Sequence, residues 1–151
     1  MSDKNSRSRL VARRGELLVE LFLQDLEPTF VSQPTVDVGH DFLVGFQNDH
    51  GGTNTFAVRF TATERPVASP FRIPSRSFRR LTYSNIPSLF LVADVKQNRL
   101  YYAWLSPGSR VRASGGSVPV PLTELNEATK ALLREQLHAA AAATTRAATV
   151  G

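Results

Sequence analysis

Four arginines lie close together between residues 72 and 80, and side chains of this type are suited to phosphate contact. The basic residues of this cluster are Arg72, Arg76, Arg79 and Arg80. The aromatic residues that alternate with them are Phe71, Phe78 and Tyr83. Guanidinium groups pair with phosphate oxygens and aromatic rings stack on bases, so the pattern predicts a nucleic-acid-binding surface. A solvated basic loop is the alternative explanation for the same residues.

Other kinds of chemistry have less support in the sequence. The chain contains no cysteine, which excludes a disulfide scaffold, a thiolate zinc site and a cysteine nucleophile. The three histidines, at positions 40, 50 and 138, have no metal-ligand spacing. The serine- and glycine-rich segments match neither a nucleophile elbow nor a phosphate-binding glycine loop.

The elements that must position the arginines begin with a helix and a hairpin. Apolar residues recur at helical spacing from residue 10 to 26, and the Glu27-Pro28 pair ends that helix. Apolar and polar residues alternate over 41–46 and again over 55–63, with a turn rich in Asn and Gly between them. These two segments are therefore predicted to form adjacent antiparallel strands.

The second half of the chain adds two strands and a final helix. Residues 89–95 form an almost continuous apolar run, which is typical of a central strand covered on both faces. Residues 100–105 follow after a short turn as its partner. A last helix is predicted to begin near Thr123, with Asn126 as a competing N-cap, and to run to about His138. The expected fold class is α/β, a mixed sheet of four or five strands with the N-terminal helix on one face and the C-terminal helix packed across it. The expected core residues are Leu18, Leu21, Phe22, Phe42, Val44, Val58, Phe60, Leu89, Leu91, Val92 and Trp104.

The expected organisation is one domain. Residues 10–138 carry the folded pattern, residues 1–9 are expected to be a disordered basic lead, and residues 139–151 an Ala-rich low-complexity tail. A Pro/Gly/Ser-rich link is expected over residues 106–121.

Five motifs follow one another in an order that is more specific than any one of them. They are Gly15-Glu16 in the first helix, Gly39-His40-Asp41 at the start of a strand, Arg59-Phe60-Thr61 on the next strand, Pro87 before the apolar strand, and Tyr102-Ala103-Trp104. In this order the chain resembles an uncharacterised bacterial domain family of the PD-(D/E)XK superfamily, whose fold is restriction-endonuclease-like. The resemblance covers about residues 10–138.

The resemblance implies metal-assisted phosphodiester hydrolysis. Glu16 and Asp41 match the family's acidic positions and would hold Mg²⁺ through oxygen ligands. The third strand departs from the family pattern of Gln-x-Lys. In one register Arg59 takes the Gln position and Thr61 the Lys position; in the other, Arg59 takes the Lys position and Ala57 that of the ligand. Neither register supplies both an oxygen ligand and a lysine, so hydrolysis is expected to be weak or lost and Mg²⁺ binding weak or absent.

Each of these residues also has a simpler explanation. Asp41 fits an ordinary turn at a strand start, and Glu16 fits a solvated glutamate near a helix N-terminus. Arg59 lies on the same strand face as Thr61 and is expected within salt-bridge reach of Asp41, where it would contact phosphate or pair with the carboxylate. The catalytic candidates are therefore Glu16, Asp41, Arg59 and Thr61.

Net charge and hydropathy indicate the kind of partner and the location to expect. The net charge is +5 and the sequence pI about 10.2, a balance that favours polyanionic partners. No signal-peptide pattern and no apolar run of the ~20 residues that cross a bilayer occur, so a cytoplasmic protein without a membrane role is expected. The expected partner is nucleic acid, with DNA preferred over RNA. The alternative is a non-catalytic interaction module on the same fold that binds a protein partner or forms a homodimer.

Overall fold

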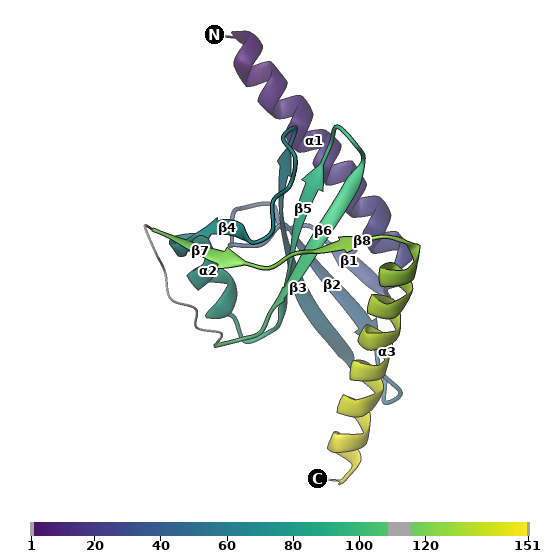
Figure 1. Cartoon of the computed structure of the whole chain (residues 1–151). Helices are drawn as coiled ribbons and strands as arrows, with labels where there is room; N and C mark the ends of the chain where they lie inside the picture. The colour runs from purple at the N-terminus through teal and green to yellow at the C-terminus, as the bar shows by residue number, and fades with distance from the viewer. Residues whose placement is uncertain (1, 109–115, 151) are drawn as a thin grey trace.

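The structure is a computed structural model that describes the backbone of residues 2–108 and 116–150 and the side chains of residues 5–108 and 116–139. Three helices and eight strands occur in this part of the chain (Figure 1). The helices are α1 (Ser2–Asp25), α2 (Ser75–Thr82) and α3 (Glu127–Val150). The strands are β1 (Phe30–Ser32), β2 (Phe42–Gln47), β3 (Thr53–Thr63), β4 (Phe71–Pro74), β5 (Ser88–Asp94), β6 (Arg99–Leu105), β7 (Ser117–Val120) and β8 (Thr123–Leu125).

Six strands form one mixed sheet in the order β1-β2-β3-β5-β6-β8. β3 and β5 pair in parallel, and the other neighbours pair antiparallel. The prediction of an α/β fold with a mixed sheet, including the β2–β3 hairpin, is confirmed. The strand count is larger than the expected four or five. Thr123–Leu125, which were expected to begin the last helix, form β8 instead; α3 begins at Glu127, directly after the competing N-cap residue Asn126. The separate two-stranded sheet of β4 and β7 was not predicted either.

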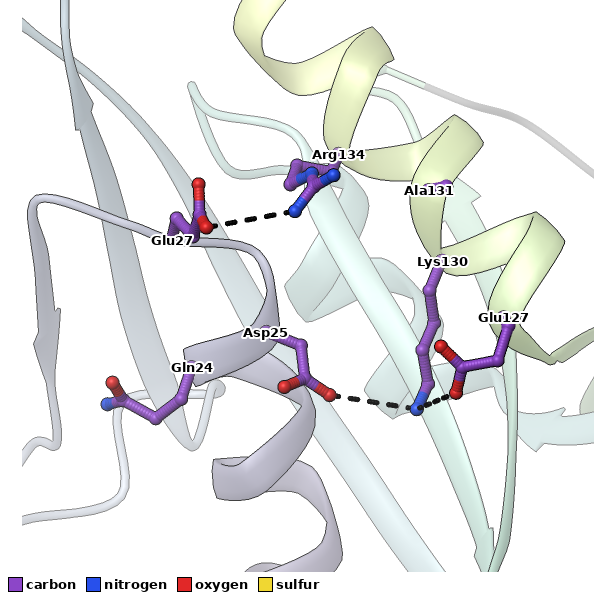
Figure 2. A pocket seen from close by; sticks show the side chains of 7 residues that line it. All are labelled: Gln24, Asp25, Glu27, Glu127, Lys130, Ala131 and Arg134. Atoms are coloured by element: carbon purple, nitrogen blue, oxygen red, sulfur yellow. Dashed lines mark ion pairs between the residues drawn. The ribbon is translucent and has the colours of Figure 1, made fainter.

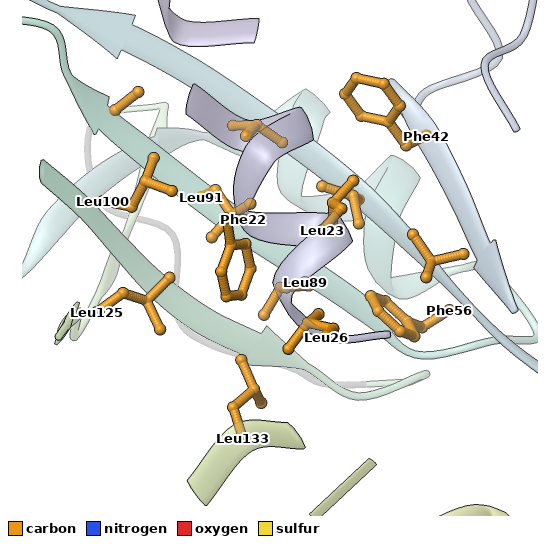
Figure 3. Packing of buried hydrophobic residues seen from close by; sticks show 14 of the residues in the cluster. Phe22, Leu23, Leu26, Phe42, Phe56, Leu89, Leu91, Leu100, Leu125 and Leu133 are labelled. Atoms are coloured by element: carbon orange, nitrogen blue, oxygen red, sulfur yellow. The ribbon is translucent and has the colours of Figure 1, made fainter. Parts of the chain in front are cut away.

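The main sheet is covered on both faces. On one face α1 and α3 pack over a large apolar cluster that includes Phe22 and Leu26 of α1 and Leu133 of α3 (Figure 3). On the other face α2, β4 and β7 pack over a smaller cluster around Phe90 and Val92 of β5. All seven residues of β5 are buried, so the continuous apolar run was correctly predicted as a central strand.

The predicted core is confirmed at most positions and wrong at one. Leu21 is 65% exposed, because the sheet covers only the side of α1 that carries Val19, Phe22 and Leu23. Leu18, Phe60 and Trp104 are partly buried against the main cluster. The other expected core residues are Phe22, Phe42, Val44, Val58, Leu89, Leu91 and Val92, and all of them are buried.

The ends of the chain differ from expectation in their helical content. α1 begins at Ser2, so residues 2–9, expected to be disordered, are helical in the structure; the exposed side chains of residues 5–9 fit the solvated character that the sequence suggested. α3 continues through the Ala-rich segment to Val150. Residues 109–115 of the expected link, and Gly151, lie outside the described residues. Among the described helices, none combines the length and apolar character that crossing a membrane requires.

Candidate functional site

Asp41 lies where β2 separates from β3. The two strands pair from Phe42 opposite Val58 to Gln47 opposite Thr53. The Asp41 N–H donates to the Val58 carbonyl at 2.7 Å. Two residues further along β3, the Phe60 N–H donates to Asp41 Oδ2 at 2.9 Å. The Asp41 side chain thus takes over as acceptor for β3 at the position where the backbone of β2 has turned away.

Arg59 projects toward this carboxylate, as the alternation along β3 predicted. Its Nε lies 4.0 Å from Asp41 Oδ2. Its Nη1 lies 3.8 Å from Asp37 Oδ1, so a single guanidinium group lies near two carboxylates. The expectation that Arg59 comes within salt-bridge reach of Asp41 is confirmed.

Asp37 connects Asp41 and Arg59 to α2, and its part in the site was not predicted from the sequence. Arg80 Nη1 lies 3.4 Å from Asp37 Oδ2, and the Gly39 N–H donates to Asp37 Oδ1 at 3.0 Å. Gly39 has φ +97°, and a Cβ placed there would lie 3.2 Å from Arg80 Nε. The turn therefore needs glycine both for its backbone conformation and for the close approach of the guanidinium group. We call Asp37, Asp41, Arg59 and Arg80 the Asp–Arg cluster.

Glu16 lies near the Asp–Arg cluster but has partners of its own. Its carboxylate pairs with Arg13 one turn earlier on α1 and accepts a 3.4 Å hydrogen bond from Gln33 Nε2. Its position follows from the close packing of its neighbour Gly15 on β3. Gly15 is buried, and a Cβ added to it would lie 2.6 Å from Ala62 Cβ. Thr61 is half-buried and lines a surface groove between β3 and the first turns of α1, together with Arg7 and Val11.

The two aspartates of the cluster differ in their protonation. Burial raises the pKa of Asp41 above its usual value; the Phe60 N–H and Arg59 oppose this shift, and the negative charges of Asp37 and Glu16 add to it. The pKa of Asp37 is lowered, first by the hydrogen bond from the Gly39 N–H and second by the charge of Arg80. Asp37 is therefore the more strongly ionised of the two carboxyls.

These surroundings do not fit a resident Mg²⁺. Magnesium needs several oxygen ligands around one point. Within residues 5–108 and 116–139, no group of three or more His, Asp or Glu side chains comes together in a way that could hold a metal. Asp41 and Glu16 each have a cationic neighbour, and Arg59 offers no lone pair to a metal. We derive no chemical step through a metal from this arrangement.

The predicted basic cluster lies on β4 and α2. All four of its arginines are exposed, Arg80 pairs with Asp37, and Arg72 Nε donates to Ser117 Oγ at 2.7 Å. Arg80 thereby connects the basic surface to the Asp–Arg cluster. The aromatic half of the prediction is only partly right. Phe78 is buried in the core and Phe71 packs on Phe90 at a ring distance of 5.9 Å, which leaves Tyr83, 80% exposed, as the ring available for stacking.

A second cleft lies between the end of α1 and the beginning of α3 (Figure 2). Lys130 Nζ lies 3.7 Å from Asp25 Oδ2 and 3.8 Å from Glu127 Oε1, and Arg134 Nη1 lies 3.8 Å from Glu27 Oε1. Opposite charges pair across the cleft, so its residues are best explained as a connection between the two helices. Nothing in the sequence pattern indicated these contacts.

Comparison with known proteins provides no family. No protein-family model matches the chain, and neither the curated proteins nor the solved structures contain a match.

Proposed function

We propose that this chain is a nuclease-like domain that binds nucleic acid, preferentially DNA, through phosphate contacts and has weak or no metal-dependent hydrolysis. The observation that supports it most directly is the position of Arg59, 4.0 Å from Asp41 and 3.8 Å from Asp37. A fixed cation beside the carboxylate that would hold a metal favours phosphate over Mg²⁺.

The fold is compatible with this proposal. A mixed sheet with helices on both faces, and an acidic residue where a hairpin's strands separate, are compatible with a restriction-endonuclease-like arrangement. The motif order Gly15-Glu16, Gly39-His40-Asp41 and Arg59-Phe60-Thr61 supports the same relationship. By that resemblance, a role in prokaryotic defence or mobile-element biology is part of the proposal.

The binding surface we propose runs from the Asp–Arg cluster across α2. Arg76 and Arg79 are exposed on the outer side of α2, while Phe78 and Leu81 hold its inner side to the sheet. The exposed Tyr83 follows at the end of the same helix. Guanidinium groups along one surface with an aromatic ring beside them suit a phosphate backbone with a base stacked on the ring.

Fluorescence anisotropy with a labelled DNA duplex at several salt concentrations tests binding. Replacing Arg76 and Arg79 by Ala should weaken binding and lower the slope of log affinity against log salt by about one per arginine. Arg134→Ala removes one positive charge from α3, on the opposite face of the sheet, as each single replacement of Arg76 or Arg79 does on α2, and it should leave the slope unchanged. If neither DNA nor RNA binds at low salt, nucleic-acid binding is wrong and a protein partner becomes the better explanation.

Incubation of supercoiled plasmid with Mg²⁺ or Mn²⁺ tests hydrolysis. We expect no cleavage, or slow cleavage, by the wild type. Efficient metal-dependent cleavage that Asp41→Asn abolishes would contradict the proposed loss of hydrolysis and leave the nuclease assignment intact. The Asn variant is chosen because its side-chain oxygen can still accept the hydrogen bond from the Phe60 N–H.

A further inference from the structure

α1 is apolar on two sides, and the sheet covers only one of them. Val19, Phe22 and Leu23 are buried against the sheet. On the other side Leu10, Leu17 and Leu21 are 65%, 50% and 65% exposed. Their spacing of seven and four residues places these three leucines in one stripe along the helix, which we call the leucine stripe. Apolar side chains aligned in this way mark an interaction surface more strongly than scattered ones do.

The first turns of α1 extend away from the body of the molecule (Figure 1). Leu10 and Leu17 also border a groove whose other wall is formed by Val95 and Lys96, just after β5. The stripe is therefore accessible along its length, and the groove beside it provides room for a second set of side chains.

Charge is distributed unevenly along α1. Residues 7–14 carry four arginines and no acidic residue, and residues 16–25 carry Glu16, Glu20 and Asp25 and no basic residue. Several of these charges already pair within the chain: Arg7 with Glu64, Arg13 with Glu16 and Glu20, and Asp25 with Lys130. A second α1 lying antiparallel would bring the basic half of each helix beside the acidic half of the other. The two helix dipoles would then be opposed as well, which is the favourable arrangement.

We propose that the leucine stripe is the interface of a homodimer in which the α1 helices of two copies pack antiparallel about a two-fold axis. With the axis midway between Leu10 and Leu21, each Leu10 packs on the Leu21 of the other copy. The two Leu17 side chains lie about one helical turn apart across the interface. Arg13 comes within about one turn of the other copy's Glu20 on the same side of the interface, close enough for their long side chains to pair. A two-fold interface of this kind uses the same surface on both copies.

This proposal does not depend on nucleic-acid binding. The interface lies on the outer side of α1, whereas the Asp–Arg cluster joins β2, β3 and α2. One pair of helices is at the small end of the range for specific interfaces, so a dissociation constant on the order of micromolar is expected.

Sedimentation velocity of the full chain over a range of concentrations measures the dimer directly, as a shift from 16.6 kDa toward twice that mass. Leu10→Glu should weaken association by about tenfold or more, because it places a charge against the apolar Leu21 of the other copy. The matched control is Leu132→Glu: Leu132 is 51% exposed on α3, and the variant should associate like the wild type. A monomeric wild type at several hundred micromolar overturns the proposal, and so does a dimer that Leu10→Glu leaves intact or that Leu132→Glu disrupts.

A charge exchange tests the antiparallel arrangement. Arg13→Glu and Glu20→Arg should each weaken the dimer several-fold, because each variant places like charges opposite one another. The double variant restores opposite charges across the two-fold axis and should recover most of the affinity. Circular dichroism confirms that each variant is folded. A double variant that is no tighter than the single variants would contradict this arrangement of the helices.

Discussion

Arg59 Nε lies 4.0 Å from Asp41 Oδ2, so a fixed cation already lies beside the carboxylate of the candidate site. A guanidinium group and a divalent metal compete for the same carboxylate, since each is attracted by its negative charge. Asp41 is further occupied by the Phe60 N–H, which donates to the same oxygen at 2.9 Å. The carboxylate therefore acts as a structural acceptor as well as a candidate ligand, and the following predictions separate these two roles.

Exchanging two side chains on β3 should partly restore metal binding. Arg59→Gln removes the competing cation and supplies an oxygen, and Thr61→Lys places a lysine two residues along on the same strand face. We expect isothermal titration calorimetry with Mn²⁺ to show binding at least about tenfold tighter in the double variant than in the wild type. Adding Asp41→Asn to the double variant should abolish the gain. Tight binding by the wild type would mean that Arg59 does not exclude the metal.

Removing Asp37 should strengthen DNA binding. Asp37 pairs with both Arg80 and Arg59, so its carboxylate competes with a phosphate for the same two guanidinium groups. Asp37→Asn removes that competition and one repulsive charge, and we expect affinity to rise by about threefold to tenfold at low salt. Fluorescence anisotropy measures the change. Asp49→Asn makes an equal charge change in the exposed β2–β3 turn and provides the control for net charge. An equal gain in DNA affinity in both variants would show that Asp37 does not compete with phosphate at the site.

The two aspartates should titrate on opposite sides of their usual value. Carbon-detected NMR of the carboxyl groups should show the Asp37 pKa below it and the Asp41 pKa above it, because the Gly39 N–H and Arg80 favour the charged form of Asp37, whereas burial disfavours that of Asp41. Arg80→Gln should raise the pKa of Asp37, and Arg59→Gln should raise that of Asp41 further. Coincident titration of the two groups would contradict the described cluster.

These shifts have opposite effects on stability. The lowered Asp37 pKa means that the unfolded chain binds this proton more readily, so the stabilisation by Asp37 is present above its usual pKa and is lost as pH falls through the lowered one. The raised Asp41 pKa means that the folded chain holds its proton longer, so stability decreases as pH rises from the usual pKa through the raised one. Asp41→Asn should abolish the second dependence and leave the first, which urea unfolding at several pH values would measure.

The sequence predicted the part of the site that depends on local periodicity. Two-residue alternation along β3 correctly placed Arg59 toward Asp41, and the Asn- and Gly-rich turn correctly joined β2 to β3. Asp37 could not be found in this way, since it lies in a loop without periodicity and meets Arg80 43 residues later only through the fold. A weak signal was present, because aspartate two residues before a glycine is a common turn.

The error at Leu21 has a different physical origin. From residue 17 to 23 α1 is apolar at every position but one, so periodicity alone does not tell which side meets the sheet. Burial of Gly15 against Ala62 determines that side in the structure, and it leaves Leu17 and Leu21 outside. β8 was missed because three residues are too few to show an alternating pattern.

Asp41→Ala should destabilise the domain more than Asp41→Asn. Alanine leaves the partly buried Phe60 N–H without its acceptor, which typically costs about 1–2 kcal/mol. Asparagine keeps an acceptor oxygen and removes a charge that burial disfavours, so its cost at pH 7 should be smaller. Urea unfolding at pH 7 measures both, with the exposed Asp49→Ala as control. If the two Asp41 variants lose equal stability, the hydrogen bond to Phe60 is not the main contribution of this side chain.

The close packing of α1 on β3 can be tested by exchanging two small residues. Gly15→Ala would place a Cβ 2.6 Å from Ala62 Cβ, too near for two methyl groups, so α1 must shift. Overpacking typically costs about 1–3 kcal/mol, whereas replacing a helical glycine by alanine gains about 1 kcal/mol, so net destabilisation is expected. Ala62→Gly alone should also destabilise, by about 1 kcal/mol, because it loosens a strand and removes a packed methyl group.

The double variant moves the methyl group from the strand to the helix. We expect it to be more stable than the sum of the two single changes predicts, by about 1 kcal/mol or more in a double-mutant cycle. Additive effects in urea unfolding would mean that Gly15 and Ala62 do not touch, and that the orientation of α1, which places Glu16 near Asp41 and turns the leucine stripe outward, has another cause.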